Sequence, residues 1–360
     1  MHSVQILRAV AALLVLVGHA GHEAVVIADR TGQVAPDLGF FDWGFGVDIF
    51  FVISGFIMLY SSADKFGVAG APREFLLRRL MRIAPLYWLL TAAMLAGAAV
   101  APSLLNVPIE SLRAVIESFF FIPGLRANGE VRPLLALGWT LNYEMFFYAA
   151  FAACLLLPRR WGLLALFTGF VAFVALGWLV RMPTTALAFW ADSIILEFLF
   201  GMAIALVLRT GLRFGSVAAL GLFLFGAALA AAGGPLWGVN EILPRCVAGG
   251  IPAAMIVFAA ACGPRLPTTR WIAPLILLGD ASYSLYLSHP FVIRPLRNIW
   301  MALPTHSLPV GWYIAFACAV AAVAAVAVYW LIERPMTKRL TRLVVRQPPA
   351  RWQAASQPVG

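Results

Sequence analysis

The segment GWYIAFACAVAAVAAVAVYWLI, residues 311–332, contains no charged side chain and is long enough to cross a bilayer as a helix. Such a helix needs about 20 predominantly apolar residues. The whole chain shares this character, because residues of the AVILMFWYC set make up 62% of its 360 positions and charged residues only 12%. A soluble domain could not bury so much apolar surface. The composition therefore predicts an all-α, polytopic integral membrane protein. It excludes a disordered chain, a coiled coil and a disulfide-rich secreted scaffold.

Apolar runs divide the chain into ten candidate membrane spans. They are the approximate ranges 4–24, 44–62, 84–101, 139–157, 163–180, 191–208, 214–232, 246–262, 272–293 and 311–332. The apolar stretch Val115–Pro123 is too short to cross a bilayer and is predicted to be interfacial or re-entrant. The first range has some features of a signal peptide. We expect it to be retained as a span, because Arg8 is its only early cation and nine further spans follow.

The Lys and Arg residues are concentrated in alternate loops. With the N-terminus in the cytoplasm, most of the 26 Lys and Arg residues fall in inward segments, and every inner loop between spans carries at least two. Since basic residues favour cytoplasmic loops, the pattern predicts an even number of spans and two cytoplasmic termini. Topology then explains most of the net charge of +10, and nucleic acid is excluded as a partner.

One transmembrane domain is expected over residues 1–337. It is followed by a tail, residues 338–360, that is first basic and then rich in Pro, Gln and Ala. We predict that this tail is solvated or binds lipid headgroups on the cytoplasmic side. The four cysteines show no CxxC or metal-type spacing and lie in or beside apolar runs, so they are interpreted as core residues.

Ionisable residues inside the spans are candidates for function, because a charge at the bilayer centre costs about 3 kcal/mol on insertion scales. Arg8 and His19 lie eleven residues apart in the first span, on one helix face and about 16 Å apart along the axis. Alone, Arg8 is also consistent with an interfacial anchor and His19 with a hydrogen bond between helices. Together they indicate a site with an anion-binding end and a proton-handling end.

Two acidic residues are candidates to orient or stabilise this imidazole, since a carboxylate can fix a histidine tautomer. Asp48 is the only acid of the second span, and Glu144 lies about a turn and a half inside the fourth. The alternatives are a hydrated interfacial acid for Asp48 and a structural ion pair for Glu144. Asp192 and Glu197 are interpreted as an interfacial helix start and are left out of the site. Glu333 is expected to pair with an arginine of a loop.

Arginines cluster just before the third span, at Arg78, Arg79 and Arg82. Arg78 and Arg82 share a helix face because they are four residues apart. Positive-inside topology alone can explain such a cluster. The preference for Arg over Lys favours phosphate recognition, because the guanidinium donates through a fork that matches phosphate geometry.

The ninth span ends with SYSLYLSH, residues 282–289, and contributes Ser282, Tyr283 and His289 as further candidates. Ser282 and His289 are two helical turns apart, which is not the spacing of a hydrolase triad. The chain also contains no GxSxG motif. Intramembrane hydrogen bonding explains the serines, whereas His289 is a second candidate imidazole.

In combination, these motifs resemble the membrane-bound acyltransferase family 3, in particular its exopolysaccharide and O-antigen acyltransferases. The resemblance rests on motifs that follow in order over residues 5–337. They are Arg8 and His19 with ten residues between them, GVDIFFVISGF (46–56), RRLMRIAPLYW (78–88), WTLNYE (139–144), SYSLYLSH (282–289) and Glu333-Arg-Pro. It implies ten spans in a bacterial inner membrane and an acyl-CoA donor, with acetyl-CoA expected. It also implies transfer to a hydroxyl of a polysaccharide or lipid-linked glycan, with no bound cofactor and no metal site.

The reaction expected from this resemblance is general-base acyl transfer. His19 would take the proton of the acceptor hydroxyl, a step suited to an imidazole whose pKa lies near working pH. Glu144 or Asp48 would orient the imidazole, and the donor phosphates would be held by arginines, namely Arg8, Arg78, Arg79 and Arg82. Two alternatives use the same residues. One is a transporter or flippase of a glycan intermediate, and the other is a non-catalytic scaffold of an envelope-polymer complex.

Overall fold

The computed structural model describes residues 1–100, 111–237, 243–267, 269–303 and 308–344. It is all-helical, with 77% of residues in helices and no strand in these ranges, which confirms the predicted fold class. The α-helices are α1 (His2–Thr31), α2 (Phe45–Ser62), α3 (Ala71–Val100), α5 (Leu112–Phe119), α6 (Trp139–Cys154), α7 (Arg159–Leu179), α8 (Thr185–Trp190), α9 (Glu197–Arg209), α10 (Ser216–Trp237), α11 (Ile251–Cys262), α12 (Ala273–Asp280), α13 (Ser282–Ser288), α14 (Pro290–Ala302), α15 (Gly311–Val328) and α16 (Arg334–Val344). Short 3₁₀ turns, η1 (Ala136–Gly138) and η2 (Ser193–Leu196), and π-helical turns, η3 (Cys246–Gly250) and η4 (Tyr329–Glu333), connect some of them.

Each of the ten predicted spans falls on helical structure, but their lengths differ. Within the described ranges, 6 helical segments are long and apolar enough to cross a membrane. They are His2–Thr31, Phe45–Ser62, Ala71–Ala98, Arg159–Leu179, Ser216–Gly233 and Gly311–Leu343. The remaining predicted spans correspond to α6, to η2 with α9, to η3 with α11, and to α12–α14. These are shorter or interrupted. For example, α12 ends before Ala281, and a new helix begins at Pro290, whose ring nitrogen cannot donate a backbone hydrogen bond.

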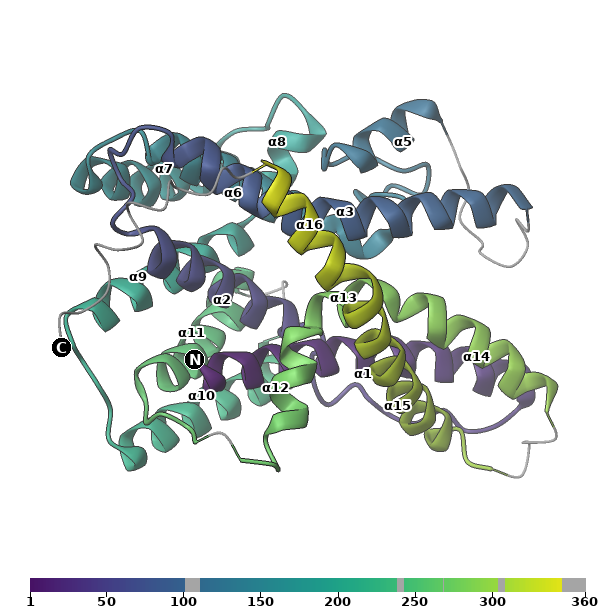
Figure 1. The fold of residues 1–360 in the computed structure, drawn as a ribbon. Coiled ribbons are helices and arrows are strands. Elements are labelled where there is room, and N and C mark those ends of the chain that lie inside the picture. The colour runs from purple at the N-terminus through teal and green to yellow at the C-terminus, as the bar shows by residue number, and fades with distance from the viewer. Residues whose placement is uncertain (101–110, 238–242, 268, 304–307, 345–360) are drawn as a thin grey trace.

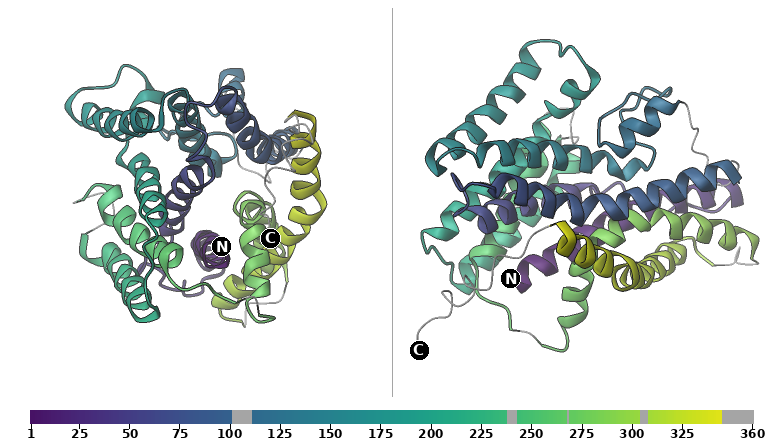
Figure 2. Two further views of the ribbon diagram at one scale, coloured as in Figure 1. Left: turned by 60° about the vertical axis from the view of Figure 1, so that its left-hand side comes forward. Right: turned by 45° about the horizontal axis from the view of Figure 1, so that its top comes forward.

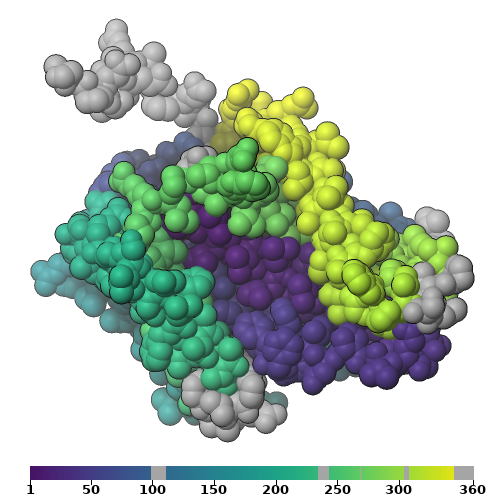
Figure 3. All heavy atoms as spheres, turned by 90° about the horizontal axis from the view of Figure 1, so that it is seen from below, coloured from purple at the N-terminus to yellow at the C-terminus, as the bar shows by residue number. Residues whose placement is uncertain are grey.

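α1 occupies the centre of the bundle. It packs against α2 and α11 on one side and against α12, α13, α14 and α15 on the other. Figure 2 shows it end-on between these two groups, and Figure 3 shows the purple N-terminal part between the green and yellow segments. Arg8 and His19 of α1 therefore lie between these two groups of helices, Arg8 partly buried and His19 exposed.

Helices α2 and α9 cross in close contact. A Cβ at Gly55 would meet the backbone carbonyl of Phe198, and a Cβ at Gly201 would meet that of Val52. Only glycine allows this approach, which is the usual device for tight helix packing in membranes. Beside this crossing, Phe198 stacks on Phe51 and on Phe147, with ring centroids 4.7 and 4.4 Å apart. This aromatic core fixes α2, and with it one wall of the site.

The expected boundary between the transmembrane domain and the C-terminal tail does not coincide with the end of a helix. The predicted limit between residues 337 and 338 falls inside α16, which packs against α3 (Figure 1). Met336 of this helix contacts the main core. The rest of the predicted tail, residues 345–360, lies outside the described residues. The short stretch around Val115–Pro123 contains the amphipathic helix α5.

Candidate active site

Two adjoining cavities lie on either side of the middle of α1. The first, here called the Arg8 cavity, has a volume of about 90 Å³. Its polar lining consists of Arg8, Ser54, Arg79, Arg82, Thr140, Glu144, Tyr148, Ser282, Tyr283 and Tyr286. The second, the His19 cavity, has a volume of about 490 Å³ and contains His19, His22, Glu23, Arg132 and Arg294 in its lining. Val47 and Tyr286 line both, so they form the wall between the cavities.

The position of Arg8 is fixed by the break between α12 and α13. Its Nη2 and Nε donate to the Ser282 hydroxyl, at 2.9 and 3.2 Å, and Nε is also 3.3 Å from the Gly279 carbonyl. The carbonyls at a helix end lack intrahelical partners, so they are free to accept such bonds. Gly279 lets α12 approach closely, because a Cβ there would meet the backbone of Gln5. Ser282 therefore serves to hold Arg8.

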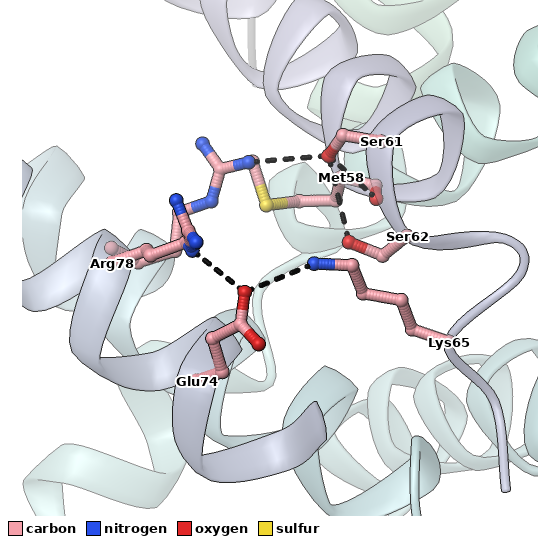
Figure 4. Close-up of polar contacts among 7 residues, drawn as sticks. Met58, Ser61, Ser62, Lys65, Glu74 and Arg78 are labelled. Carbon is pink, nitrogen blue, oxygen red and sulfur yellow. Dashed lines mark hydrogen bonds and ion pairs between the residues drawn. The ribbon is translucent and has the colours of Figure 1, made fainter. Parts of the chain in front are cut away.

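Only part of the arginine cluster lines the cavity, and it is not the pair that the sequence predicted to share a helix face. Arg79 and Arg82, three residues apart, line the Arg8 cavity, whereas Arg78 does not. The Nε of Arg78 donates to Glu74 at 2.9 Å, and the Glu74 carboxylate also contacts Lys65 at 3.4 Å (Figure 4). Arg78 is thus part of an exposed ion-pair network. Of the predicted donor-binding arginines, the structure brings together only Arg8, Arg79 and Arg82.

Glu144 reaches the Arg8 cavity from α6. It interacts with the hydroxyls of Ser54 and Tyr148 and with the charges of Arg82 and Arg8. These partners across the bundle explain how the membrane interior accommodates a glutamate. Glu144 does not line the His19 cavity, so the structure does not bring it to the imidazole.

Another acid reaches the same arginines. Glu333, in η4, accepts a hydrogen bond from Ser284 at 2.5 Å and adds a second negative charge near Arg82 and Arg8. Its hydrogen-bond partner is the Ser284 hydroxyl, so a pair with a loop arginine stays a prediction. Glu144 and Glu333 both interact electrostatically with Arg82 and Arg8, and they offset only part of the charge of the three arginines of the Arg8 cavity.

His19 is oriented by its own helix. Its Nδ1 lies 2.8 Å from the Val15 carbonyl. Since a carbonyl can only accept, Nδ1 carries the hydrogen and Nε2 has the free lone pair. The side chain is exposed to the His19 cavity. The backbone thus fixes the tautomer for which the sequence had proposed Glu144 or Asp48.

His289 packs against this ring, with centroids 5.0 Å apart. It is buried, and its Nδ1 likewise lies 3.0 Å from a backbone carbonyl, that of Leu285. Its Nε2 has no hydrogen-bond partner among the described residues. Tyr283, by contrast, anchors α13 to α3 by donating to the Ile83 carbonyl at 2.7 Å.

Asp48 has a partner that the sequence did not indicate. Both of its oxygens accept from Arg245, at 3.0 and 2.8 Å, and the carboxylate is 1% exposed. This correction replaces the predicted contact with His19. Glu197, interpreted from the sequence as interfacial, is 0% exposed and lies against the same pair. In the topology expected from the sequence Arg245 falls in an outward segment, where basic residues are sparse, and this is a signal that could have revealed the cluster.

In the ranges that the structure describes, no three His, Cys, Asp or Glu side chains converge as metal ligands would. The His19 cavity presents an imidazole, and the Arg8 cavity presents guanidinium groups.

Comparison with known proteins identifies the class. A family model described as acyltransferase domain matches residues 1–330. The chain is 36% identical over 297 residues to the exopolysaccharide production protein ExoZ of Rhizobium meliloti (strain 1021), covering 82% of this chain and 89% of that protein. It is 28% identical over 278 residues to the acyltransferase MdmB of Streptomyces mycarofaciens, covering 69% and 67%. No solved structure matches. The chain belongs to this acyltransferase family and is an O-acyltransferase, which favours the predicted enzyme over the transporter and scaffold alternatives.

The Asp48, Glu197 and Arg245 cluster predicts an order of stabilities. Arg245→Gln leaves two acids buried without their cation and should destabilise the detergent-solubilised protein by about 3–5 kcal/mol. Asp48→Asn should cost less, because Glu197 remains beside Arg245. Denaturant unfolding compares both with Arg181→Gln, an exposed control. Equal stability of the two cluster variants would contradict a shared cluster.

Proposed function

We propose that this acyltransferase moves a short acyl group, with acetyl expected, from acyl-CoA in the Arg8 cavity to a glycan hydroxyl in the His19 cavity. The acceptor is a polysaccharide or a lipid-linked glycan, and the similarity to an exopolysaccharide production protein supports this class. The observation that carries the proposal is the pair of cavities. One is lined by arginines and the other by an imidazole, and only Val47 and Tyr286 are common to both.

The proposed chemistry assigns the base to His19. Its Nε2 takes the proton of the acceptor hydroxyl while that oxygen attacks the thioester carbonyl. The carbon–sulfur bond then breaks, and the proton passes from the imidazole to the leaving thiolate, so the base is regenerated. The hydrogen bond from Nδ1 to the Val15 carbonyl keeps Nε2 free for this role and stabilises the imidazolium.

Donor binding is assigned to Arg8, Arg79 and Arg82. Their guanidinium groups suit the phosphates of coenzyme A, because each presents a planar fork of donors. In this proposal the acyl-pantetheine arm of the donor enters the Arg8 cavity, and the nucleotide stays at its mouth, within reach of the arginines.

The proposed topology has ten spans and both termini in the cytoplasm of a bacterium, with the protein in the inner membrane. Six spans are the long apolar segments, and the other four are α6, η2 with α9, η3 with α11, and α12–α14. The contacts of Arg8 with Ser282 and of His19 with His289 support this order. They require α1 and α13 to run parallel, as the first and ninth spans of an alternating bundle must. The Arg8 cavity then faces the cytoplasm.

The base assignment predicts that His19→Gln lowers acyl transfer by about 100-fold or more, because glutamine hydrogen-bonds but does not accept a proton at neutral pH. Transfer of radiolabelled acetyl from acetyl-CoA to polysaccharide measures this loss at matched protein abundance. His22→Gln in the same cavity is the control and should remain active. If His19→Gln retains more than about a tenth of wild-type turnover, the base is not His19 and His289 becomes the leading candidate.

The donor assignment separates neighbouring arginines. Arg79→Gln and Arg82→Gln should each weaken acetyl-CoA binding by about 1.5–3 kcal/mol for each charged hydrogen bond lost, roughly tenfold or more in apparent Kd. Arg78→Gln, which removes a neighbouring charge bound to Glu74, should change it little. Equilibrium binding to the purified protein provides the comparison. An equal loss for all three variants would indicate a general charge effect instead of a specific site.

The topology predicts the location of reporter fusions. Fusions after Arg160, Arg213 and Arg270 should report the cytoplasm, and a fusion after Arg126 the opposite side, because the spans between them alternate. Each position is fused to two reporters in turn, one active in the cytoplasm and one active on the opposite side, so that either location gives a positive signal. An external signal at Arg160 would falsify the ten-span arrangement.

A further inference from the structure

The His19 cavity presents an unusual charge for its location. In the proposed topology it opens outward, where Lys and Arg are normally sparse. Yet its lining contains Arg132 and Arg294. A third arginine, Arg297, forms an ion pair with Glu23 of the same lining. Since topology does not account for arginines on this side, each of them needs a partner, either in the protein or in a ligand.

Glu23 accounts for one of these arginines. Its carboxylate is 6% exposed and is bound by Arg297 at 2.6 Å, with that guanidinium itself only 18% exposed. Arg294 lies farther from the same carboxylate, at 3.4 Å, and its side chain is 43% exposed. Arg294, Arg297 and Glu23 together carry a net positive charge, because two guanidinium groups face one carboxylate. Of the three side chains, Arg294 is the most exposed.

Arg132 adds a second positive charge. Its nearest acidic partner is Glu130 at 3.6 Å, beyond hydrogen-bond distance, and both side chains are about half exposed. An exposed pair at this distance contributes little, so the Arg132 guanidinium remains available to a ligand. It comes from the segment before η1, whereas Arg294 comes from α14. Both line the cavity that contains the catalytic imidazole.

Two indole rings complete the lining of this cavity. Trp43 and Trp139 both line it, and the Trp43 nitrogen already donates to the Leu38 carbonyl at 3.0 Å. Its N–H is therefore satisfied, and the apolar ring is what it offers to a ligand. Such faces pack against the C–H groups of sugar rings. The cavity thus combines apolar walls, an imidazole base and two exposed guanidinium groups.

We propose that the His19 cavity selects acceptor glycans with an anionic group, a carboxylate or a phosphate, which Arg132 and Arg294 bind beside the hydroxyl that is acylated. This inference rests on the proposed function. The charge has two chemical sources, an acidic sugar or the diphosphate of a lipid carrier. In either case the guanidinium groups bind anionic oxygens through paired donors.

The test compares acceptors that share hydroxyl stereochemistry and differ in charge. Methyl glycosides of glucose, galactose and mannose form the neutral set. The matching methyl uronosides carry a carboxylate, and the same sugars linked to farnesyl diphosphate carry the lipid-type anion. Transfer from radiolabelled acetyl-CoA by the purified full-length protein gives kcat/KM for each. We expect a preference of about tenfold or more for one anionic set over the neutral set, and the set identifies the source of the charge.

Arg132→Gln with Arg294→Gln should reduce this preference to less than about threefold, since the charged hydrogen bonds are lost. Arg181→Gln, an exposed outward arginine away from the cavity, should preserve it. Equal transfer to neutral and anionic acceptors, or a preference that survives the double substitution, would overturn the inference and leave the proposed function intact. No transfer to any acceptor would contradict the proposed function itself.

Discussion

Everything in this bundle depends on the cost of burying a charge away from water. The structure meets that cost by pairing. Asp48 binds Arg245, Glu23 binds Arg297, and Arg8 binds Ser282 and the end of α12. Each of these contacts joins segments far apart in the sequence, so the polar groups also determine which helices are neighbours. Apolar packing alone would distinguish them poorly, because lipid is as apolar as the helix surfaces.

The cost of burying a charge distinguishes polar groups that hold the fold together from polar groups that can interact with a substrate. A buried group whose bonds are all made inside the protein is not available to a substrate, and Asp48 is an example. Other groups keep unused hydrogen-bonding capacity toward a cavity, for example the Nε2 atom of His19 and the guanidinium groups of Arg79 and Arg82. The second imidazole, His289, lies between these classes, because its buried Nε2 has no partner in the described ranges although it contacts the ring of His19.

The sequence predicted the helices well, because an apolar run has few alternatives to a helix in a membrane. Helical spacing places Arg8 and His19 along one side of α1, and the structure shows that they line two different cavities. The sequence grouped Arg78, Arg79 and Arg82 together, whereas only Arg79 and Arg82 line the Arg8 cavity. Arg78 and Arg79 are each about one turn from Arg82, so only the packing of α3 decides which of them faces inward. The sequence also missed Arg245, which is 197 positions from Asp48, and no local pattern connects such residues.

The proposed acyl transfer also depends on the wall between the two cavities, which Val47 and Tyr286 form. In the proposed reaction a thioester in one cavity and a hydroxyl in the other must come within about 3–3.5 Å, so the two substrates would have to meet at this wall. That barrier also has to remain closed to ions. Tyr286 suits this position because its hydroxyl donates to the Leu137 carbonyl and accepts from Thr140, each at 3.1 Å. Its polar end is thereby satisfied within the protein, and its ring closes the passage. Ser282 and Tyr286 follow one another on α13, and His289 caps its C-terminus. A single short helix thus spaces the arginine end, the wall and the imidazole end of the site.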